Sequence, residues 1–387
     1  MFAVFTRARK AALVALSALV LASCDVGIGG GGPSIDTSAP VPVALLVPRG
    51  SAQPGDAILA VSLENAARLA IADLQGVKID LRVYDTAGDA GTAATVASQA
   101  VDEGARIILG PVYAESANAA GLAVRNRNVN VLSFSNNPSI AGGNVFILGP
   151  TFENTAARMA SYAARQGKRN TVVVYSTDLA GTAGRDAFQA AANRAGGRVA
   201  SSVPFELSQQ SVIAAIPRIK DAVASAGADS IFLTANTAGA LPLMSQLLPE
   251  AGVAPGQVQY MGLTRWDIPS QTLELPGVQG GWFALPDPNK AAVFNSRYAA
   301  AYGGAPHPIG GLAYDGIAAI GALVGAGKAD ALTGGALTQG AGFQGVGGIF
   351  RLNGDGTNSR GLAVATIQNK QVVVIDPAPT TFSGAGL

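Results

Sequence analysis

The amino-acid sequence predicts an α/β fold with two lobes, each built on parallel strands flanked by helices. Short continuous apolar segments, typical of buried parallel strands, alternate with segments that have helical spacing of apolar residues. The alternation runs through two successive series, the second beginning after residue 148. The chain has 387 residues, which is enough for two domains or one bilobal domain.

The first series consists of strands separated by helices. Ile58, Val61, Leu63 and Ala66 recur at helical spacing, so the segment they belong to is expected to be helical. The expected strands are 43–47, 81–84, 107–109, 129–132 and 145–148, and the expected helices are 56–74 and 92–103.

The second series repeats this pattern and then changes character. Its expected helices are 155–166, 183–195, 212–226, 241–248, 291–302 and 312–324, and its expected strands are 171–175, 231–233, 258–261 and 281–285. The last segments, 348–352, 361–367 and 372–375, with a turn at 353–356, predict an antiparallel ribbon.

The restart of the alternation gives the expected domain boundaries. Lobe 1 is expected to contain residues 41–149 and 284–341, and lobe 2 residues 150–283 and 342–376, followed by a tail at 377–387. The chain would then cross between the lobes near residues 149–150, 283–284 and 341–342. Ligands of such sheets bind outside the carboxyl ends of the strands, so a cleft between the lobes is expected to hold the site.

The first 40 residues predict export and a lipid anchor. Arg7, Arg9 and Lys10 precede a short apolar run, which is typical of a secretory signal peptide at residues 1–23. The run ends in Leu-Ala-Ser-Cys24, which resembles the lipobox of bacterial lipoproteins, whose cysteine is acylated. Residues 24–40, with four consecutive glycines, are expected to form a flexible tether. The protein is therefore expected on the periplasmic side of the cell envelope, held to a membrane by its N-terminal lipid.

The composition argues against several classes of function. The formal net charge is +1, so the chain lacks the basic field that nucleic-acid binding needs. One cysteine and one histidine cannot form the usual zinc site, and no nucleophile or phosphate-loop motif is complete. We therefore expect no enzyme activity, no cofactor, no metal and no nucleic-acid partner.

Polar loops follow several of the expected strands and are candidates for the cleft lining. Helix N-termini and hydroxyl and amide groups in these loops suit a small polar ligand, although each residue alone could equally cap a helix or form a turn. These residues, called the cleft candidates below, are Tyr113, Ser116, Ser135, Asn136, Asn137, Asp178, Thr234, Arg265 and Trp266.

A resemblance to a known family rests on stretches that occur in order along the chain. They are 43–48, 84–86, 107–111, 132–136, 265–267, 281–288, 312–315 and 345–351. Through them the chain resembles type I periplasmic binding proteins of the Leu/Ile/Val-binding kind and, within these, the penicillin-binding-protein activator lipoproteins. The resemblance implies a non-enzymatic, lipid-anchored protein that activates a penicillin-binding protein making peptidoglycan. The alternative is a substrate-binding lipoprotein that serves an ABC permease for branched-chain amino acids or a related small polar ligand.

The same resemblance bears on the ligand. The amino-acid binders of this fold have a serine at position 114, a threonine-containing run at 135–137, a tyrosine near 180 and an acid near 264–265, and this chain departs from all of them. Without an acid, a buried ammonium group has no charge partner. These departures favour the activator role and argue against ordinary amino-acid binding.

Overall fold

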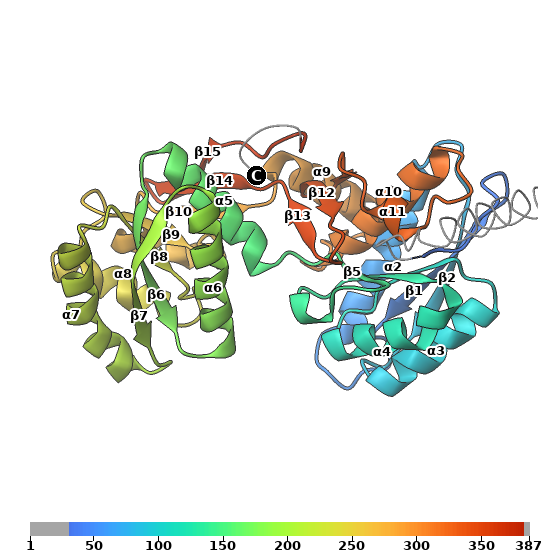
Figure 1. Cartoon of the computed structure of the whole chain (residues 1–387), viewed down its shortest axis with the longest axis horizontal. Coiled ribbons are helices and arrows are strands. Elements are labelled where there is room, and N and C mark those ends of the chain that lie inside the picture. Colours follow the sequence, from blue (N-terminus) through green and yellow to red (C-terminus); the bar gives the residue numbers. More distant parts are fainter. Residues whose placement is uncertain (1–30, 383–387) are drawn as a thin grey trace, which may run out of the picture.

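The computed structural model describes residues 31–382. The expected signal peptide at 1–23, Cys24 and the first part of the tether lie outside the described residues, as do the last five residues. Figure 1 shows two lobes side by side, connected by the segments that carry the chain from one lobe to the other. The two-lobed α/β fold with mostly parallel sheets is confirmed.

The sheet of lobe 1 has five parallel strands in the order β2-β1-β3-β4-β5. The interior strand β1 pairs with both β2 and β3, so that Leu45 lies opposite Val83 and Leu109. The strands are β1 (Val41–Val47), β2 (Ile79–Asp85), β3 (Ile107–Leu109), β4 (Asn130–Ser133) and β5 (Val145–Ile147).

Helices cover both faces of this sheet, because side chains of a strand alternate between its faces. Val43 and Leu45 point into the larger core with α2 and α10, whereas Ala44 and Leu46 pack against α3 and α4. The helices of lobe 1 are α2 (Asp56–Asp73), α3 (Ala90–Asp102), α4 (Ala114–Val124), α9 (Pro288–Tyr302), α10 (Gly311–Gly325) and α11 (Gly334–Leu337).

The sheet of lobe 2 has seven strands in the order β15-β14-β10-β9-β8-β6-β7. Strands β14 and β15 are antiparallel additions at one edge of an otherwise parallel sheet. The strands are β6 (Asn170–Ser176), β7 (Arg198–Phe205), β8 (Ser230–Leu233), β9 (Gln259–Gly262), β10 (Trp282–Leu285), β14 (Ala363–Gln368) and β15 (Gln371–Asp376).

Two helix layers also sandwich the sheet of lobe 2. Val172 and Val174 pack with α7 and α8, and Val173, between them in sequence, packs with α5 and α6. The helices are α5 (Phe152–Arg165), α6 (Leu179–Arg194), α7 (Gln209–Ala226) and α8 (Leu241–Glu250). Short 3₁₀ turns occur at η1 (Arg125–Arg127), η2 (Pro138–Ile140), η3 (Ser270–Glu274) and η4 (Pro276–Val278).

The expected antiparallel ribbon is divided between the lobes. β11 (Phe343–Gly345), β12 (Gly348–Leu352) and β13 (Asn358–Arg360) form a separate antiparallel sheet. Phe343 and Phe350 of this sheet are buried in the core of lobe 1, not of lobe 2. The third crossing therefore lies at Gly361, between β13 and β14, and differs from the expected position near 341–342. The second crossing lies after β10, which pairs with β9 of lobe 2 at Trp282 and Phe283 and with β14 along its whole length.

The segments at the two ends pack more closely than their composition predicts. Ile35, within the expected tether, is buried in the core of lobe 1, and its N–H donates to the Ala329 carbonyl. The Asn130 amide donates to the carbonyls of Gly31 and Leu332, which fixes this segment further. At the other end, the Pro377 carbonyl accepts from Arg158, and the Phe382 ring lies under the Arg351 guanidinium. Each of these segments is therefore held by an apolar or aromatic contact together with hydrogen bonds.

Candidate functional site

The loops after β1 and β3 bring Tyr113 against an acid that the sequence reasoning missed. Asp56 is the first residue of α2, and its carboxylate accepts a hydrogen bond of 2.6 Å from the Tyr113 hydroxyl. The other carboxylate oxygen, Oδ2, is buried and has no hydrogen-bond partner among the described residues. Burial and this hydrogen bond raise the pKa of Tyr113 to about 12. The pattern of an acid opening a helix after a parallel strand could have indicated Asp56.

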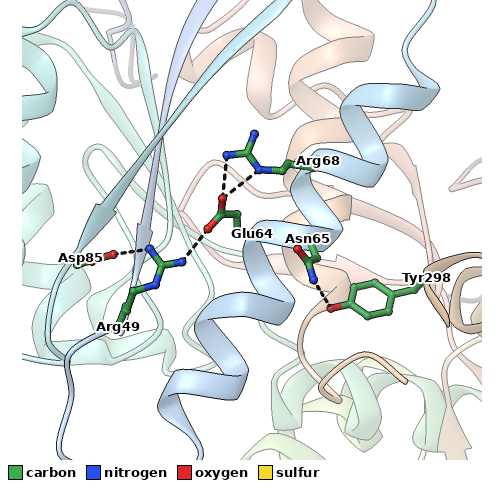
Figure 2. Close-up of polar contacts among 6 residues, drawn as sticks. All are labelled: Arg49, Glu64, Asn65, Arg68, Asp85 and Tyr298. Atoms are coloured by element: carbon green, nitrogen blue, oxygen red, sulfur yellow. Dashed lines mark hydrogen bonds and ion pairs between the residues drawn. The ribbon is translucent and has the colours of Figure 1, made fainter. Parts of the chain in front are cut away.

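The helix that carries Asp56 is held in place by a network of ion pairs, drawn in Figure 2. Arg49, which follows β1, pairs with Glu64 of α2 at 2.7 Å and with Asp85 at the end of β2 at 3.1 Å. Glu64 also pairs with Arg68 one turn further along α2.

The opposite end of α2 is fixed by α9 and α10. Asn65 donates to the Tyr298 hydroxyl, and Asp73 accepts from Arg297 and Tyr314. The Arg297 hydrogen bond holds the pKa of Asp73 below its usual value. Together these contacts fix the position of α2, and hence of Asp56, relative to the carboxyl end of β1.

The remaining candidates of lobe 1 belong to two separate groups. Ser116 is buried, and its hydroxyl lies 3.4 Å from the Gly88 carbonyl, so its role is structural. Ser135 is buried and accepts from the Asn137 N–H, while Asn136 is exposed. The Asn137 side chain caps the short turn η2 through the Ser139 N–H. Asn136 and Asn137 are both exposed, but the Asn137 side chain is used as a cap, and the Ser135 hydroxyl accepts a hydrogen bond and donates none within residues 31–382.

In lobe 2, Asp178 and Thr234 lie at the carboxyl ends of neighbouring strands. Asp178 caps α6 through the Gly181 N–H and also accepts from the Ser176 hydroxyl. The Thr234 hydroxyl accepts from the Ser176 N–H. Asp178 and Thr234 therefore meet at Ser176, and both are engaged in holding the loop.

The loop after β9 contains an internal ion pair and a core residue. Arg265 binds Asp267 through two hydrogen bonds, so its charge is matched within the loop. Trp266 is fully buried in the core of lobe 2 and stacks on Phe283. Its ring occupies the space left by Gly262 and Gly281, since a Cβ at either glycine would lie within 2.3 Å of it. Trp266 therefore does not line a cleft, and the expectation that it does is wrong.

No hydrogen bond joins a cleft candidate of lobe 1 to one of lobe 2 within the described residues 31–382. The candidates instead form one group per lobe. The structure thus places polar loops at the carboxyl ends of both sheets and leaves each group bonded within its own lobe.

The three crossings between the lobes meet in one place, which the sequence reasoning did not identify. Pro150, Pro286 and Leu362, one from each crossing, line a small cavity of about 140 Å³. Buried Asn358 of β13 donates to the carbonyls of Ile147 and Gly149 at the first crossing. The Asn154 amide of α5 in turn donates to the Asn358 carbonyl and so connects lobe 2 to the same point.

The place where the three crossings meet, at Pro150, Pro286 and Leu362, is called the hinge below. It also contains a buried ion pair. Arg360 of β13 pairs with Asp315 of α10 at 3.1 Å, with side chains 10% and 2% exposed. Arg360 also donates to the Leu148 carbonyl, and Asp315 accepts from the Val346 N–H. Burial raises the pKa of Asp315, and the Arg360 guanidinium opposes this shift. The pair connects the first and third crossings to α10 of lobe 1.

The described residues contain no group of three or more His, Cys, Asp or Glu side chains that could hold a metal ion. No helix within residues 31–382 is long and apolar enough to cross a membrane.

Comparison with known proteins gives a family. The family model described as periplasmic binding protein matches residues 40–371. No curated protein matches the chain.

Several solved structures have the same fold. A branched-chain amino acid ABC transporter periplasmic ligand-binding protein from Burkholderia xenovorans has 16% identity and a TM-score of 0.66, with 89% of this chain and 97% of that chain covered. An ABC transporter substrate-binding protein from Desulfitobacterium hafniense in complex with Leu has 18% identity and a TM-score of 0.61, with 87% and 100% covered. A solute-binding protein from Rhodopseudomonas palustris in complex with 3,4-dihydroxybenzoic acid has 17% identity and a TM-score of 0.56, with 87% and 96% covered. At these identities the likeness shows the fold.

Proposed function

Because this chain belongs to the periplasmic binding protein family, we propose that it binds a small polar ligand between its lobes and presents it to an ABC permease. The observation that carries the proposal is the two-lobed architecture itself, with polar loops at the carboxyl ends of both sheets and three crossings gathered into one hinge. This arrangement suits a ligand that touches both lobes and changes the angle between them.

This proposal takes the alternative reached from the sequence over the penicillin-binding-protein activator. The related structures that bind ligands are substrate-binding and solute-binding proteins. Asp56 also supplies an acid in lobe 1, in place of the one absent at positions 264–265, so a ligand with an ammonium group is compatible with this chain. The activator role rests on the sequence resemblance alone.

The side chains indicate the class of ligand. The free Oδ2 of Asp56 accepts from an ammonium or hydroxyl group, and the Ser135 hydroxyl and the exposed Asn136 amide donate to a carboxylate. We therefore propose a small amino or hydroxy acid. Catalysis is not part of the proposal, because the substrate-binding function requires no bond to be made or broken.

Ligand binding is expected to raise the melting temperature of the purified protein. A panel of branched-chain amino acids, hydroxy acids and aromatic acids is measured by thermal unfolding, and a ligand near 100 times its Kd stabilises by roughly 2.7 kcal/mol, a shift of a few degrees. Asp56→Asn is expected to abolish the shift. The matched control is Asp80→Asn, at the amino end of β2 and paired with Arg82, which should retain the shift.

The opposite result is equally specific. If no panel member shifts the melting temperature, and a penicillin-binding protein copurifies with the chain from native envelopes, the activator role replaces the receptor role. If leucine, isoleucine and valine leave the melting temperature unchanged while a hydroxy acid or an aromatic acid raises it, the proposal stands. The class of ligand is then restricted to that acid.

We further propose that Cys24 carries a lipid that holds the protein on the periplasmic side of the envelope. Cys24→Ser is expected to leave the precursor unprocessed by the lipoprotein peptidase and to remove lipid labelling, since the thiol is the acylated group. The measurement is labelling with a radioactive fatty acid together with detergent-phase partitioning. Unchanged labelling of the variant would contradict the assignment of the anchor.

A further inference from the structure

A second pocket lies beside the first crossing, with walls from both lobes. Its volume is about 420 Å³. Lobe 2 contributes the first turns of α5 and the last residue of α6, and lobe 1 contributes the β12–β13 turn. None of the cleft candidates lines it. In Figure 1 these elements lie in the middle of the molecule, around α5 and β13.

Four arginines line this pocket: Arg158, Arg194, Arg351 and Arg360. Arg158 is 6% exposed, and its outer nitrogen bonds Asp376 and the Pro377 carbonyl. Its Nε is buried and has no hydrogen-bond partner in the described part of the chain. Burial without a partner for an N–H group of a charged side chain is unfavourable, so Arg158 has an unsatisfied donor in the wall beside the pocket.

Arg360, which lines the pocket from lobe 1, is likewise a buried arginine whose Nε has no partner among the described residues. Its outer nitrogens bond Asp315 and the Leu148 carbonyl, and its Nε is buried without a partner among residues 31–382. Two buried guanidinium groups, one from each lobe, thus line one pocket with an unsatisfied donor each. A structural ion pair accounts for the outer nitrogens and leaves the two Nε groups unexplained.

The other two arginines are more accessible. Arg351 lies over the Phe382 ring at 4.7 Å and has no ion pair within the described residues. Arg194 is exposed at the end of α6 and likewise has no ion pair in the described part of the protein. A basic residue in the last turn also suits the helix dipole, so the test below separates that role from ligand binding.

Acidic and neutral side chains complete the lining. Glu153 and Asp355 are the acidic residues, and the Asp355 carboxylate is already occupied by the N–H and hydroxyl of Thr357. Asn154, Asn358 and Ser359 add amide and hydroxyl groups. Since Arg158 and Arg360 are already paired with Asp376 and Asp315, the guanidinium groups of the lining that are unpaired within the described residues are those of Arg194 and Arg351, and the amide and hydroxyl groups beside them suit hydroxyls.

We propose that this pocket is a second ligand site, which binds the carboxylate or phosphate groups of a small organic anion between the two lobes. Guanidinium groups bind such oxyanions through parallel N–H donors, which Arg194 and Arg351 can supply, one from each lobe. Because the walls belong to different lobes, an anion bound here links α5 to the β12–β13 turn. The site is separate from the loops around Asp56 and does not depend on the proposed receptor function.

The probes are citrate and inorganic phosphate, compared with sodium chloride at the same ionic strength. We expect citrate or phosphate at 10 mM to raise the melting temperature of the purified protein by ~1–3 °C. A rise in melting temperature with citrate but not with phosphate indicates a polycarboxylate ligand. A rise with phosphate but not with citrate indicates a phosphate ester. The double variant Arg194→Gln/Arg351→Gln is expected to weaken the affinity, measured by calorimetry, at least tenfold. These two residues are chosen because they are more accessible than Arg158 and Arg360, so the variant is expected to fold.

The controls locate the effect. Arg218→Gln removes an exposed arginine of α7, and Arg265→Gln removes the arginine of the cleft loop; both are expected to retain the shift. A purely structural role of Arg194 would lower the melting temperature without ligand and leave the anion-dependent shift unchanged, which would overturn the proposal. No shift by either anion in the unaltered protein, or a shift lost in Arg265→Gln and kept in the double variant, would overturn it as well.

Discussion

Replacing Arg360 with alanine is expected to lower the free energy of unfolding by about 3–5 kcal/mol, the largest effect of any single charge removal at the hinge. The substitution leaves the Asp315 carboxylate, 2% exposed, without its cation. It also removes the donor to the Leu148 carbonyl and so frees the first crossing from the third. Urea unfolding followed by circular dichroism measures the change.

A matched control is available in the same lobe. Arg297→Ala breaks an ion pair with Asp73 whose side chains are 45% and 30% exposed, and we expect a loss of about 1 kcal/mol or less. The double variant Asp315→Leu/Arg360→Met should recover most of the stability, because apolar residues of similar size often replace a buried ion pair without loss. A cost of Arg360→Ala no larger than that of Arg297→Ala would show that the hinge does not depend on the pair.

Replacing Trp266 with alanine is also expected to cost about 3–5 kcal/mol, because it empties a fully buried space in the core of lobe 2. The ring lies between two glycines whose missing side chains make room for it, and it stacks on Phe283 at 6.4 Å. Chemical denaturation measures the loss. Trp282→Ala serves as the control, since Trp282 is only half-buried, and a smaller loss is expected there.

The milder change Trp266→Phe tests the function of this residue. Since Trp266 belongs to the core, the variant should lose stability and keep the affinity for the ligand found in the thermal panel. If the variant is as stable as the original protein and binds the ligand more weakly, Trp266 contributes to ligand binding, and its assignment to the core is contradicted.

The sequence predicts the interior strands and helices because buried segments are rich in apolar residues, which can be seen in the composition. Val43 to Val47 and Ile107 to Leu109 are continuous apolar runs, and the structure places them in the middle of the sheet of lobe 1. β7 was not predicted, because it is an edge strand whose residues from Arg198 to Ser202 are mostly small or polar and partly exposed. Pairing with β6 forms this strand, and a partner is not visible in local composition.

The third crossing could not be placed from the sequence for a related reason. The segments from 348 to 376 all have strand-like composition, and nothing local says which core each one joins. The structure divides them at Gly361, where a Cβ would lie 2.7 Å from Ile349. Which lobe a strand belongs to depends on contacts such as that of Phe350 with the core of lobe 1, distant in sequence.

The sequence predicts where the polar loops lie, and their role in ligand binding stays a prediction. The loops were placed correctly after their strands, but hydroxyl and amide groups there serve mainly as caps and turn partners, as Asp178 and Asn137 do. Asp56 and the hinge residues Asn358 and Arg360 were missed, because their significance comes from burial and from partners more than 40 residues away. The sequence shows that a residue is polar, but only the fold shows whether its side chain already has a hydrogen-bond partner within the protein.

The packed segment at Ile35 limits how far the protein can stand off from a bilayer. If Cys24 is the lipidated residue, seven residue steps separate it from Gly31, whose carbonyl accepts from the Asn130 amide. Seven residue steps can span at most roughly 25 Å even when fully stretched. Lobe 1 would then lie close to the membrane surface, and lobe 2 would be connected to it through the three crossings. The two lobes would therefore lie at different distances from the permease proposed as partner, and lobe 1 would be the lobe held near the membrane.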